Sequence, residues 1–393
     1  MDMLGGLTPS EFLRDYWQKK PLVIRQAFPD FQCPVSADEL AGLACEEGVE
    51  SRIVIENDDG KPWQLHNGPF SPDRFSSLPE QDWTLLVQGL DHWVPDIADL
   101  LEHFRFIPNW RLDDIMASFA PKGGSVGPHY DQYDVFLLQA QGHRRWTFGG
   151  HCDHTSPRVE GTPLRILSSW DGEETVTLAP GDMLYLPPGI GHHGVAEDDC
   201  ITLSVGFRAP TVDDILTGFT DFLCSQSDAS DHLNDPDLKI QDNPGTIQPD
   251  VVDRLETVIR EKLEARRQLA LWFGQFSTAP KSMDIVVPAE EPASTGDVAE
   301  AIHAGEHLAE AIRAGEQLRW NEGSRFAYYE FASETALFVD GEQFLLKGDA
   351  QPFAPLLCSG ARVDMPTLAR LSEDEALLGL LTTLYNQGSI YFE

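Results

Sequence analysis

Short apolar runs, each ended by glycine, proline or aspartate, dominate the middle of the chain. Between residues 114 and 210 they are IMASFA, DVFLLQA, RRWTFGG, ETVTLAP, DMLYLPPG and CITLSVGFRAP. Runs of this length with turn residues between them are typical of β-strands, and strands so short and frequent favour a sandwich or a barrel. Nearer the start, SEFLRDYWQKKPLVIRQAF predicts a helix and then a strand after Pro21, and SRIVIEN predicts a further strand.

The pattern changes to helical periodicity after Arg208. TVDDILTGFTDFLCSQ places five apolar residues on one helical face, and VVDRLETVIREKLEARRQLALWF repeats that pattern. The five are Ile215, Leu216, Phe219, Phe222 and Leu223. Two helices form too small a unit to be a domain alone, so we expect them to dock on the barrel or on a second copy, and we predict a homodimer.

A third unit follows a stretch rich in proline, alanine, serine and acids at residues 279–297, which indicates a linker. RFAYYEF and TALFVDGEQFLLK predict strands around a turn at Asp340 and Gly341. MPTLARL and EALLGLLTTLYNQG predict helices, and SIYFE predicts a last strand. Helices with a small sheet resemble a winged helix. A near-repeat within residues 301–318, AIHAGEHL and then AIRAGEQL, predicts a helix extended by local duplication.

The charge balance changes what this winged helix can bind. The chain has 64 acidic and 28 basic residues, a formal net charge of −36, which repels phosphate backbones and attracts basic partners. Residues 301–393 alone hold 14 acidic and 6 basic residues, a net charge of −8. We therefore expect no direct nucleic-acid binding and a winged helix that packs against protein. Adaptation to a salty cytoplasm is an alternative reason for the acidity.

Cysteine usage and hydropathy bound the location of the protein. The six cysteines are scattered singly, with no CxxC pair, so free thiols are expected. No run of about 18 apolar residues exists, and the start MDMLGGLTPSEFLRDYWQKK lacks the basic-then-apolar order of a secretory signal. The prediction is a cytoplasmic protein with no membrane partner.

Candidate chemistry begins in PHYDQYDVFLLQAQGHRRW. In an extended strand alternate side chains share a face, so His129 and Asp131 can reach one ion. A second HxD, His151 and Asp153, shows that this pattern alone has little specificity. Context strengthens the first instance, because LAPGDMLYLPPGIGHHG predicts a strand and a rigid Pro-Pro-Gly bend that presents His192.

Two histidines and one carboxylate leave metal positions open, which is the arrangement of non-haem Fe(II) oxygenases. The adjacent residues Arg144 and Arg145 must point to opposite faces of their strand. One of the two can therefore point into the barrel and bind the far carboxylate of an iron-chelating dicarboxylate.

These motifs together resemble the JmjC-type 2-oxoglutarate oxygenases, specifically the bacterial ribosomal oxygenases that hydroxylate arginine. The resemblance covers nearly the whole chain. It rests on FLRDYWQKKPLVIR, WQLHNGPF, SFAPKGGSVGPHYDQYDVFLLQ, GDMLYLPPGIGHHG, SVGFRAP and LYNQGSIYFE. It implies an α+β fold in which a double-stranded β-helix, the cupin or JmjC barrel, fills residues 1–210. A helical dimerisation domain at 211–278, the linker and a winged-helix-like domain at 298–393 follow.

The resemblance also implies a ligand set and cofactors. Iron is expected on His129, Asp131 and His192, and 2-oxoglutarate on Arg144 with help from Ser118, which leaves Arg145 facing outward. The PPGxxH spacing of the family selects His192 over the neighbouring His193.

Several other polar residues near these motifs are assigned less specific roles. His151, Cys152 and His154 have no partner at matching spacing and are expected in a surface loop. Four residues flank the ligands and are expected either to shape the substrate entrance or to pack in the barrel. These four are Tyr130, Gln132, Tyr133 and Asp134, of which Asp134 could pair with a guanidinium.

The resemblance implies hydroxylation of an arginine β-carbon in the sixteenth protein of the large (50S) ribosomal subunit, a basic client that suits an acidic enzyme. Relatives with the same iron site hydroxylate a histidine in another ribosomal protein or remove N-methyl groups from lysine, and these remain alternatives. A non-catalytic cupin and winged-helix protein for assembly or regulation is the alternative from another class. The triad with Arg144 argues against it, because a binder needs neither open iron positions nor a carboxylate clamp.

Overall fold

The computed structural model describes residues 3–58, 61–226, 232–281, 285–302 and 317–392, and it divides into two compact units. The first unit is Met1–Ala209 with Ser282–Val287 and Asn321–Gly323, and the second is Pro210–Lys281, Pro288–Trp320 and Ser324–Glu393. Of the near-repeat, residues 303–316 lie outside the described residues.

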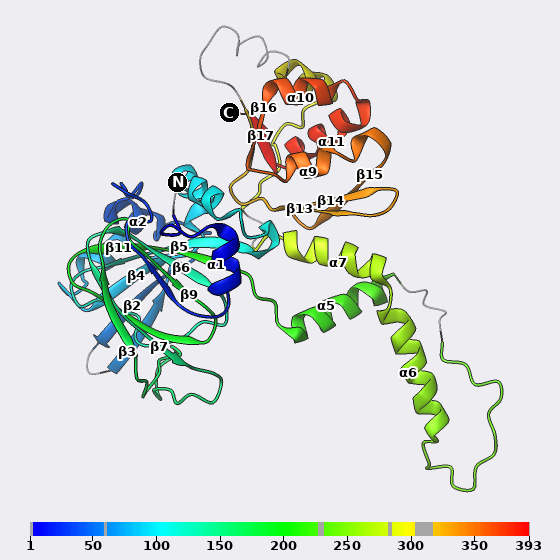
Figure 1. Ribbon diagram of the computed structural model, residues 1–393, viewed down its shortest axis with the longest axis horizontal. Helices are drawn as coiled ribbons and strands as arrows, with labels where there is room; N and C mark the ends of the chain where they lie inside the picture. The colour runs from blue at the N-terminus through cyan, green and yellow to red at the C-terminus, as the bar shows by residue number, and fades with distance from the viewer. Residues whose placement is uncertain (1–2, 59–60, 227–231, 282–284, 303–316, 393) are drawn as a thin grey trace. The chain divides into compact units, whose positions relative to one another are not determined.

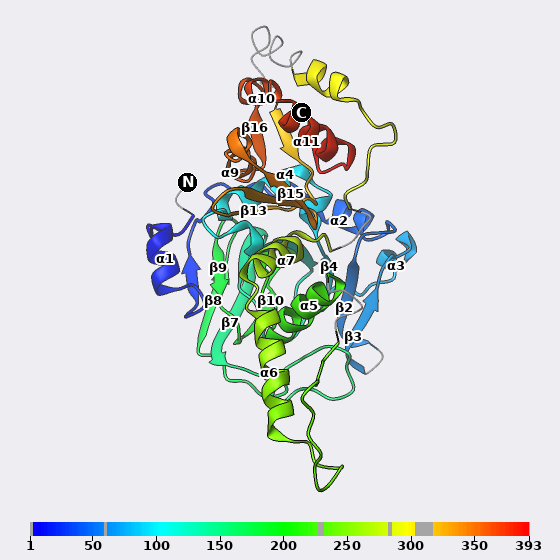
Figure 2. The same cartoon turned by 90° about the vertical axis from the view of Figure 1, so that its right-hand side faces the viewer.

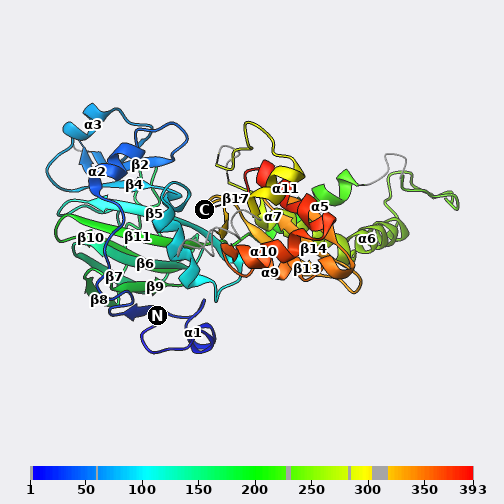
Figure 3. The same ribbon diagram turned by 90° about the horizontal axis from the view of Figure 1, so that it is seen from above.

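The first unit is built on two antiparallel sheets, whose strands are seen side by side in Figure 3. The large sheet has the order β1 (Leu22–Ile24), β9 (Met183–Leu186), β6 (Val135–Gln141), β11 (Cys200–Phe207), β5 (Leu112–Ala120), β4 (Trp83–Val87), β2 (Ser51–Asp58) and β3 (Lys61–Asn67). The small sheet has the order β10 (Ile190–Ala196), β7 (Arg144–His151) and β8 (Glu174–Leu178).

Alternation along the strands gives the large sheet two apolar faces. The inner face packs on the small sheet through one buried cluster, whose members include Val135, Leu137, Leu184 and Leu186 from the large sheet and Trp146, Phe148 and Leu178 from the small one. This face-to-face packing of the two sheets is the predicted double-stranded β-helix.

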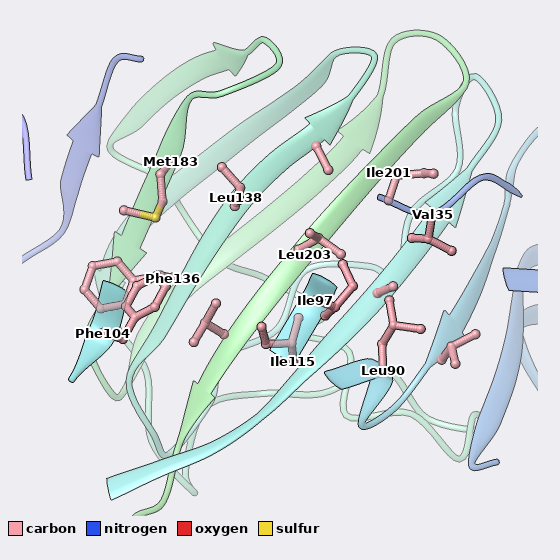
Figure 4. Close-up of a cluster of buried hydrophobic side chains, with 14 of the residues drawn as sticks. Val35, Leu90, Ile97, Phe104, Ile115, Phe136, Leu138, Met183, Ile201 and Leu203 are labelled. Atoms are coloured by element: carbon pink, nitrogen blue, oxygen red, sulfur yellow. The ribbon is translucent and has the colours of Figure 1, made fainter. Parts of the chain in front are cut away.

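The outer face of the large sheet carries the main hydrophobic core, part of which is drawn in Figure 4. Phe136, Leu138 and Leu203 pack there with Ile97 and Phe104 from the helical segments. Burial of each such side chain contributes about 1.5–3 kcal/mol to the stability of the fold. The helices of this unit are α1 (Pro9–Asp15), α2 (Ala37–Leu43), α3 (Pro72–Ser76), α4 (Pro95–Ala98) and the short 3₁₀ segments η1 (Leu90–His92), η2 (Asp99–Phe104) and η3 (Asn109–Arg111).

The predicted strands of this unit are all present, but two local expectations need correction. His129 and Asp131 do not lie in a regular strand, because the ladder of β6 begins only at Val135 and His129 forms a single bridge. His192 lies inside a strand, β10, and not at the end of one. Glycines at 189, 191 and 194 hid this strand from a reading based on apolar alternation.

The second unit begins with three helices where two were predicted: α5 (Val212–Ser225), α6 (Pro249–Leu263) and α7 (Arg266–Thr278). The second predicted helix is broken at Glu264 and Ala265, both of which leave helical geometry. The two halves have different surroundings, since no residue of α6 is buried whereas Trp272 of α7 packs on Phe219 of α5. In Figures 1 and 2, α6 projects away from α5 and α7.

The rest of the second unit has two small sheets and short helices. The sheets are β16 (Arg362–Asp364), β12 (Gln317–Trp320) and β17 (Ile390–Phe392), and β13 (Phe326–Glu330), β14 (Thr335–Val339) and β15 (Glu342–Leu346). The helices are η4 (Gly348–Ala350), α9 (Phe353–Leu357), α10 (Met365–Ser372) and α11 (Glu375–Asn386). Residues 295–302 are also helical and start under a cap from Ser294, so helix begins inside the expected linker.

Helix α7 is anchored on the β13–β15 sheet. A Cβ on Gly274 would lie 2.3 Å from the ring of Phe338, so the helix backbone rests directly on that ring. Thr278 Oγ1 accepts a hydrogen bond of 3.1 Å from the backbone of Gly341, in the predicted turn. Among the described residues, no helix is long and apolar enough to cross a membrane.

Candidate metal and cosubstrate site

Two segments that are distant in sequence meet as a narrow backbone ribbon. His129 N donates to His192 O at 3.0 Å, and His192 N donates to His129 O at 2.8 Å. The ribbon continues with a bond of 2.8 Å from Gly189 N to Asp131 O. Gly189 has a φ of +79°, which the Pro-Pro-Gly bend requires and which few other residues adopt. Reciprocal backbone bonds thus hold the three candidate ligands at one place.

The side chains of His129, Asp131 and His192 converge from this ribbon. Their ligand atoms all lie within 4.8 Å of one another. Within the described residues, these three side chains form a group that could hold a metal ion. His192 Nε2 is 3.6 Å from Asp131 Oδ2, and the two imidazole rings are 4.2 Å apart between centroids. His192 is buried, whereas His129 and Asp131 are partly exposed.

Backbone carbonyl groups determine which ring nitrogen of each histidine is available. His129 Nδ1 donates to Gly127 O at 2.9 Å, and His192 Nδ1 donates to Ile190 O at 3.0 Å. A carbonyl oxygen can only accept, so each Nδ1 carries the proton and each Nε2 keeps a lone pair. This arrangement of outer hydrogen bonds is the usual way in which proteins orient metal-ligating histidines.

The electrostatics of the site favour the neutral ligand form of His192. Burial, and after it the neighbouring His129, lower the pKa of His192 to about 4. A neutral imidazole is the form that binds a metal. Two imidazole nitrogens and one carboxylate fit a borderline ion such as Fe(II) and leave other coordination positions for exchangeable ligands.

The remaining sequence candidates for the metal lie elsewhere. His193 belongs to the opposite face of β10, paired with Thr147, and is not part of the converging group. His154 is exposed in the loop after β7, as expected, but His151 is the last residue of β7, where it pairs with Ile190. Cys152 is buried and not at the surface, which corrects the expectation for that residue, and all six cysteines are free, as predicted.

Arg144 points into the barrel and Arg145 points out. Arg144 is 4 % exposed, whereas Arg145 is exposed on the outer face of the small sheet. Arg144 Nη1 donates to Ser118 Oγ across the barrel at 3.3 Å. Its Nε and Nη2 are buried and have no hydrogen-bond partner within the part of the chain that the structure describes. Buried guanidinium nitrogens without partners are costly, and a carboxylate would satisfy both in a forked geometry. The pocket therefore fits the far carboxylate of 2-oxoglutarate.

The residues that flank the ligands separate into two groups. Asp134 is fully buried, where it accepts hydrogen bonds from Tyr185 Oη at 2.6 Å and Gln18 Nε2 at 2.9 Å. These hydrogen bonds within the core indicate that Asp134 serves barrel packing. Tyr133 is 42 % exposed, and the packing around its hydroxyl together with the charges of Asp131 and Asp114 raises the pKa of Tyr133.

Sequence reasoning missed two features beside the site. Gln88 Nε2 donates to both carboxylate oxygens of Asp114, at 3.1 and 2.9 Å, which orients that carboxylate. The loop between β7 and β8, residues 152–173, reaches the ligand segment through bonds to Pro128 and Tyr130. Neither feature has a periodic pattern, although the length of this loop indicates a role beyond connection.

Comparison with known proteins agrees with this geometry. Residues 99–215 match the JmjC domain family, and residues 260–391 match the ROXA-like winged helix family. The ribosomal protein uL16 3-hydroxylase of Escherichia coli K12 is 34 % identical over 389 residues, which cover 98 % of this chain and 97 % of that protein. A probable ribosomal oxygenase of Haemophilus influenzae is 41 % identical over 270 residues, 67 % of this chain and 64 % of that protein.

A solved structure extends the match to the whole fold. The ribosomal oxygenase YcfD from Escherichia coli, in complex with cobalt and 2-oxoglutarate, aligns with a TM-score of 0.85 at 33 % identity and covers 99 % of both chains. The barrel, the triad and the inward arginine thus define a 2-oxoglutarate-dependent oxygenase of the JmjC type. Within that class, the chain belongs to the ribosomal oxygenase family.

Proposed function

We propose that this enzyme hydroxylates the β-carbon of an arginine side chain in ribosomal protein uL16. The observation that carries the proposal is the convergence of His129, Asp131 and His192 beside the inward guanidinium of Arg144. The identity of the client comes from the full-length similarity to the Escherichia coli enzyme.

In this proposal each polar group of the pocket has one task. His129, Asp131 and His192 hold Fe(II), and Arg144 with Ser118 holds the far carboxylate of 2-oxoglutarate. Bound iron and 2-oxoglutarate supply the oxidising chemistry, in which oxygen is consumed and succinate and carbon dioxide are released. The carbonyls of Gly127 and Ile190 keep both imidazoles in the ligand tautomer. The apolar core between the two sheets keeps water from the inner part of the pocket.

Client recognition is assigned to the aromatic ring of Tyr133 beside the triad, which is 42 % exposed. An aromatic face can stack on the guanidinium of an arginine side chain. A net charge of −36 suits a basic ribosomal protein and disfavours direct binding of nucleic acid. Such a client places the enzyme in the cytoplasm.

Residues 1–210 are assigned to catalysis, residues 211–278 to dimerisation, and residues 298–393 to the winged helix beyond a linker. The exposed apolar side chains of α6 support a homodimer, because a single chain leaves them in water. They are Val252, Leu255, Val258, Ile259 and Leu263, between 39 % and 57 % exposed.

The test is intact-protein mass spectrometry of unmodified uL16 after incubation with the enzyme, Fe(II), oxygen and 2-oxoglutarate. His129→Ala is the inactive control. Parallel reactions contain other large-subunit ribosomal proteins and a methyl-lysine peptide. We expect one added oxygen on a single arginine of uL16, and none with the variant. Oxygen on a histidine, loss of methyl groups, or no change with an iron-loaded enzyme would each contradict the proposal.

A further inference from the structure

The loop between β7 and β8 contains a small hairpin at residues 158–167. Arg158 and Leu167 form an isolated antiparallel bridge, and Val159 N donates to Ile166 O at 2.9 Å. Its tip is held on β3, where Thr162 Oγ1 donates to the carbonyl of Trp63 at 2.8 Å. In Figure 1 the loop that leaves β7 runs beside the end of β3.

This hairpin forms hydrogen bonds to the residues on both sides of His129. Leu167 N donates to Pro128 O at 2.7 Å, directly before the histidine. Arg158 donates through Nη2 to Tyr130 Oη at 3.2 Å, directly after it. The ligand segment needs such support, since it forms only a single bridge and no regular ladder.

A third contact reaches the group that orients the imidazole. Ile166 is 2 % exposed and rests on Gly127, where a Cβ would lie 2.6 Å from its Cδ1 and 3.2 Å from its Cγ2. Gly127 has a φ of +80°, and Ser125 Oγ accepts a hydrogen bond from its N–H at 3.0 Å. The carbonyl of this same glycine accepts the proton of His129 Nδ1. Ile166 thus packs, together with the ring of Trp63, against the glycine that carries this carbonyl.

We propose that Ile166 is a positioning residue for the metal site, acting through the backbone of Gly127 to hold the His129 imidazole in its ligand orientation. The inference rests on the proposed role of His129 as a metal ligand and is independent of which client the enzyme hydroxylates. His192 needs no such brace, because the carbonyl of Ile190 belongs to β10 itself.

The test is the metal affinity of Ile166→Ala. Its matched control is Ile24→Ala, a substitution of the same type at a side chain 1 % exposed on β1. Each purified chain is titrated with Co(II) in the absence of 2-oxoglutarate and followed by the d–d absorption of the bound ion. Loss of an outer-shell contact typically weakens metal binding about 10- to 100-fold. We expect a loss in that range for Ile166→Ala and less than about threefold for Ile24→Ala.

Two further measurements separate positioning from general destabilisation. Ile166→Val keeps Cγ2 and should stay within about fivefold of the wild-type affinity, which also provides a testable variant if the alanine form does not fold. In the zinc-loaded chain with ¹⁵N-labelled histidine, the Nδ1–H resonance of His129 should be protected from exchange in the wild type and lose protection in Ile166→Ala.

Equal Co(II) affinities for Ile166→Ala and Ile24→Ala, with similar falls in Tm, would overturn the inference and leave the metal site intact. A wild-type chain that binds no Co(II) would instead refute the metal site and the inference with it. If Ile166→Ala lost Co(II) affinity as expected and Ile24→Ala did not, but the wild type failed to hydroxylate uL16, the inference would be supported. Only the choice of client would then be contradicted.

Discussion

Arg144 Nη1 and Ser118 Oγ lie 3.3 Å apart and join the small sheet to the large sheet inside the barrel. The bond occupies one nitrogen of the guanidinium and leaves Nε and Nη2 facing the same buried space. Ser118 thus orients the side chain of Arg144. The two remaining donors, Nε and Nη2, fit a carboxylate in a forked geometry.

This geometry predicts different effects for the two adjacent arginines. Arg144→Ala should raise the Kd for 2-oxoglutarate about 10- to 100-fold, because a charge-assisted hydrogen bond contributes about 1.5–3 kcal/mol. Arg145→Ala removes the same charge from the exposed face and should change the Kd less than about twofold. Calorimetric titration of the manganese-loaded chains measures both. Equal losses in the two variants would show that net charge, and not position, governs binding.

A second prediction distinguishes His192 from His193. His192→Ala should abolish binding of one equivalent of metal, since it removes one of three converging donors. His193→Ala lies on the other face of β10 and should retain one equivalent. Metal content after dialysis against Fe(II) or Mn(II) under nitrogen measures the difference. A metal-free His193→Ala chain that remains folded would reassign the ligand.

The buried carboxyl of Asp134 predicts a pH-dependent stability difference. Burial raises the pKa of Asp134 above 3.8 despite its bonds from Tyr185 and Gln18. Because the folded pKa is the higher one, this group stabilises the fold fully below its unfolded pKa, and that stability is lost as pH rises through the folded pKa. Asp134→Asn removes the dependence. Relative to the wild type, the variant should therefore gain stability as the pH rises above the ordinary aspartate pKa of 3.8.

Urea unfolding at low chain concentration measures this difference, and the dilution matters because the isoelectric point is near 4.5. Tyr328→Phe, at a tyrosine 42 % exposed, is a control for removal of a polar group elsewhere. If Asp134→Asn instead lost stability relative to the wild type as the pH rises, that result would contradict the raised pKa of Asp134.

Two helical glycines of the second unit should respond oppositely to alanine. At Gly274 a Cβ would meet the ring of Phe338 at 2.3 Å, so Gly274→Ala should destabilise by about 1–3 kcal/mol through overpacking. At Gly379, inside α11, nothing lies within 4 Å, so Gly379→Ala should stabilise by up to about 1 kcal/mol. Thermal unfolding of both variants measures the signs. A stable Gly274→Ala chain would mean that α7 can shift away from the sheet.

If the chain forms the proposed dimer, charged substitutions among the exposed apolar side chains of α6 should lower the molecular mass of the particle in solution. Leu255→Glu with Ile259→Glu should convert the dimer to a monomer, because each substitution places a charge where apolar contact is expected. Glu261→Lys, on the opposite side of the helix, should leave the dimer intact. Light scattering after size-exclusion chromatography measures the masses. A monomeric wild type would remove the assignment of residues 211–278 to dimerisation.

Short apolar runs between turn residues were sufficient to predict most of the barrel, because its strands are buried on both faces. The alternation of side chains along a strand predicted that Arg144 and Arg145 face opposite ways, and the family resemblance selected Arg144 as the inward one. It could not locate β10, whose glycines contribute no apolar period. It also placed His129 and Asp131 in a strand, although a bridge, a glycine carbonyl and a separate loop hold them.

Other features depend on contacts that no local pattern encodes. The break between α6 and α7 separates a helix with no buried residue from one that packs on a sheet, and periodicity alone reads both as one helix. The burial of Asp134 depends on Tyr185 and Gln18, which approach from distant segments. The bracing of Gly127 by Ile166 is likewise a tertiary contact.

The backbone pairing of His129 with His192 also determines when the metal site can form during synthesis and folding of the chain. During synthesis His129 leaves the ribosome well before His192, and β10 can pair with β7 only after both are complete. With His129 and His192 as the proposed ligands, the complete iron site would form only once the barrel has closed. A metal that binds only the native state adds to its stability by mass action. In an iron-poor cell this enzyme would lose turnover and, with it, part of the free energy that keeps newly made copies folded.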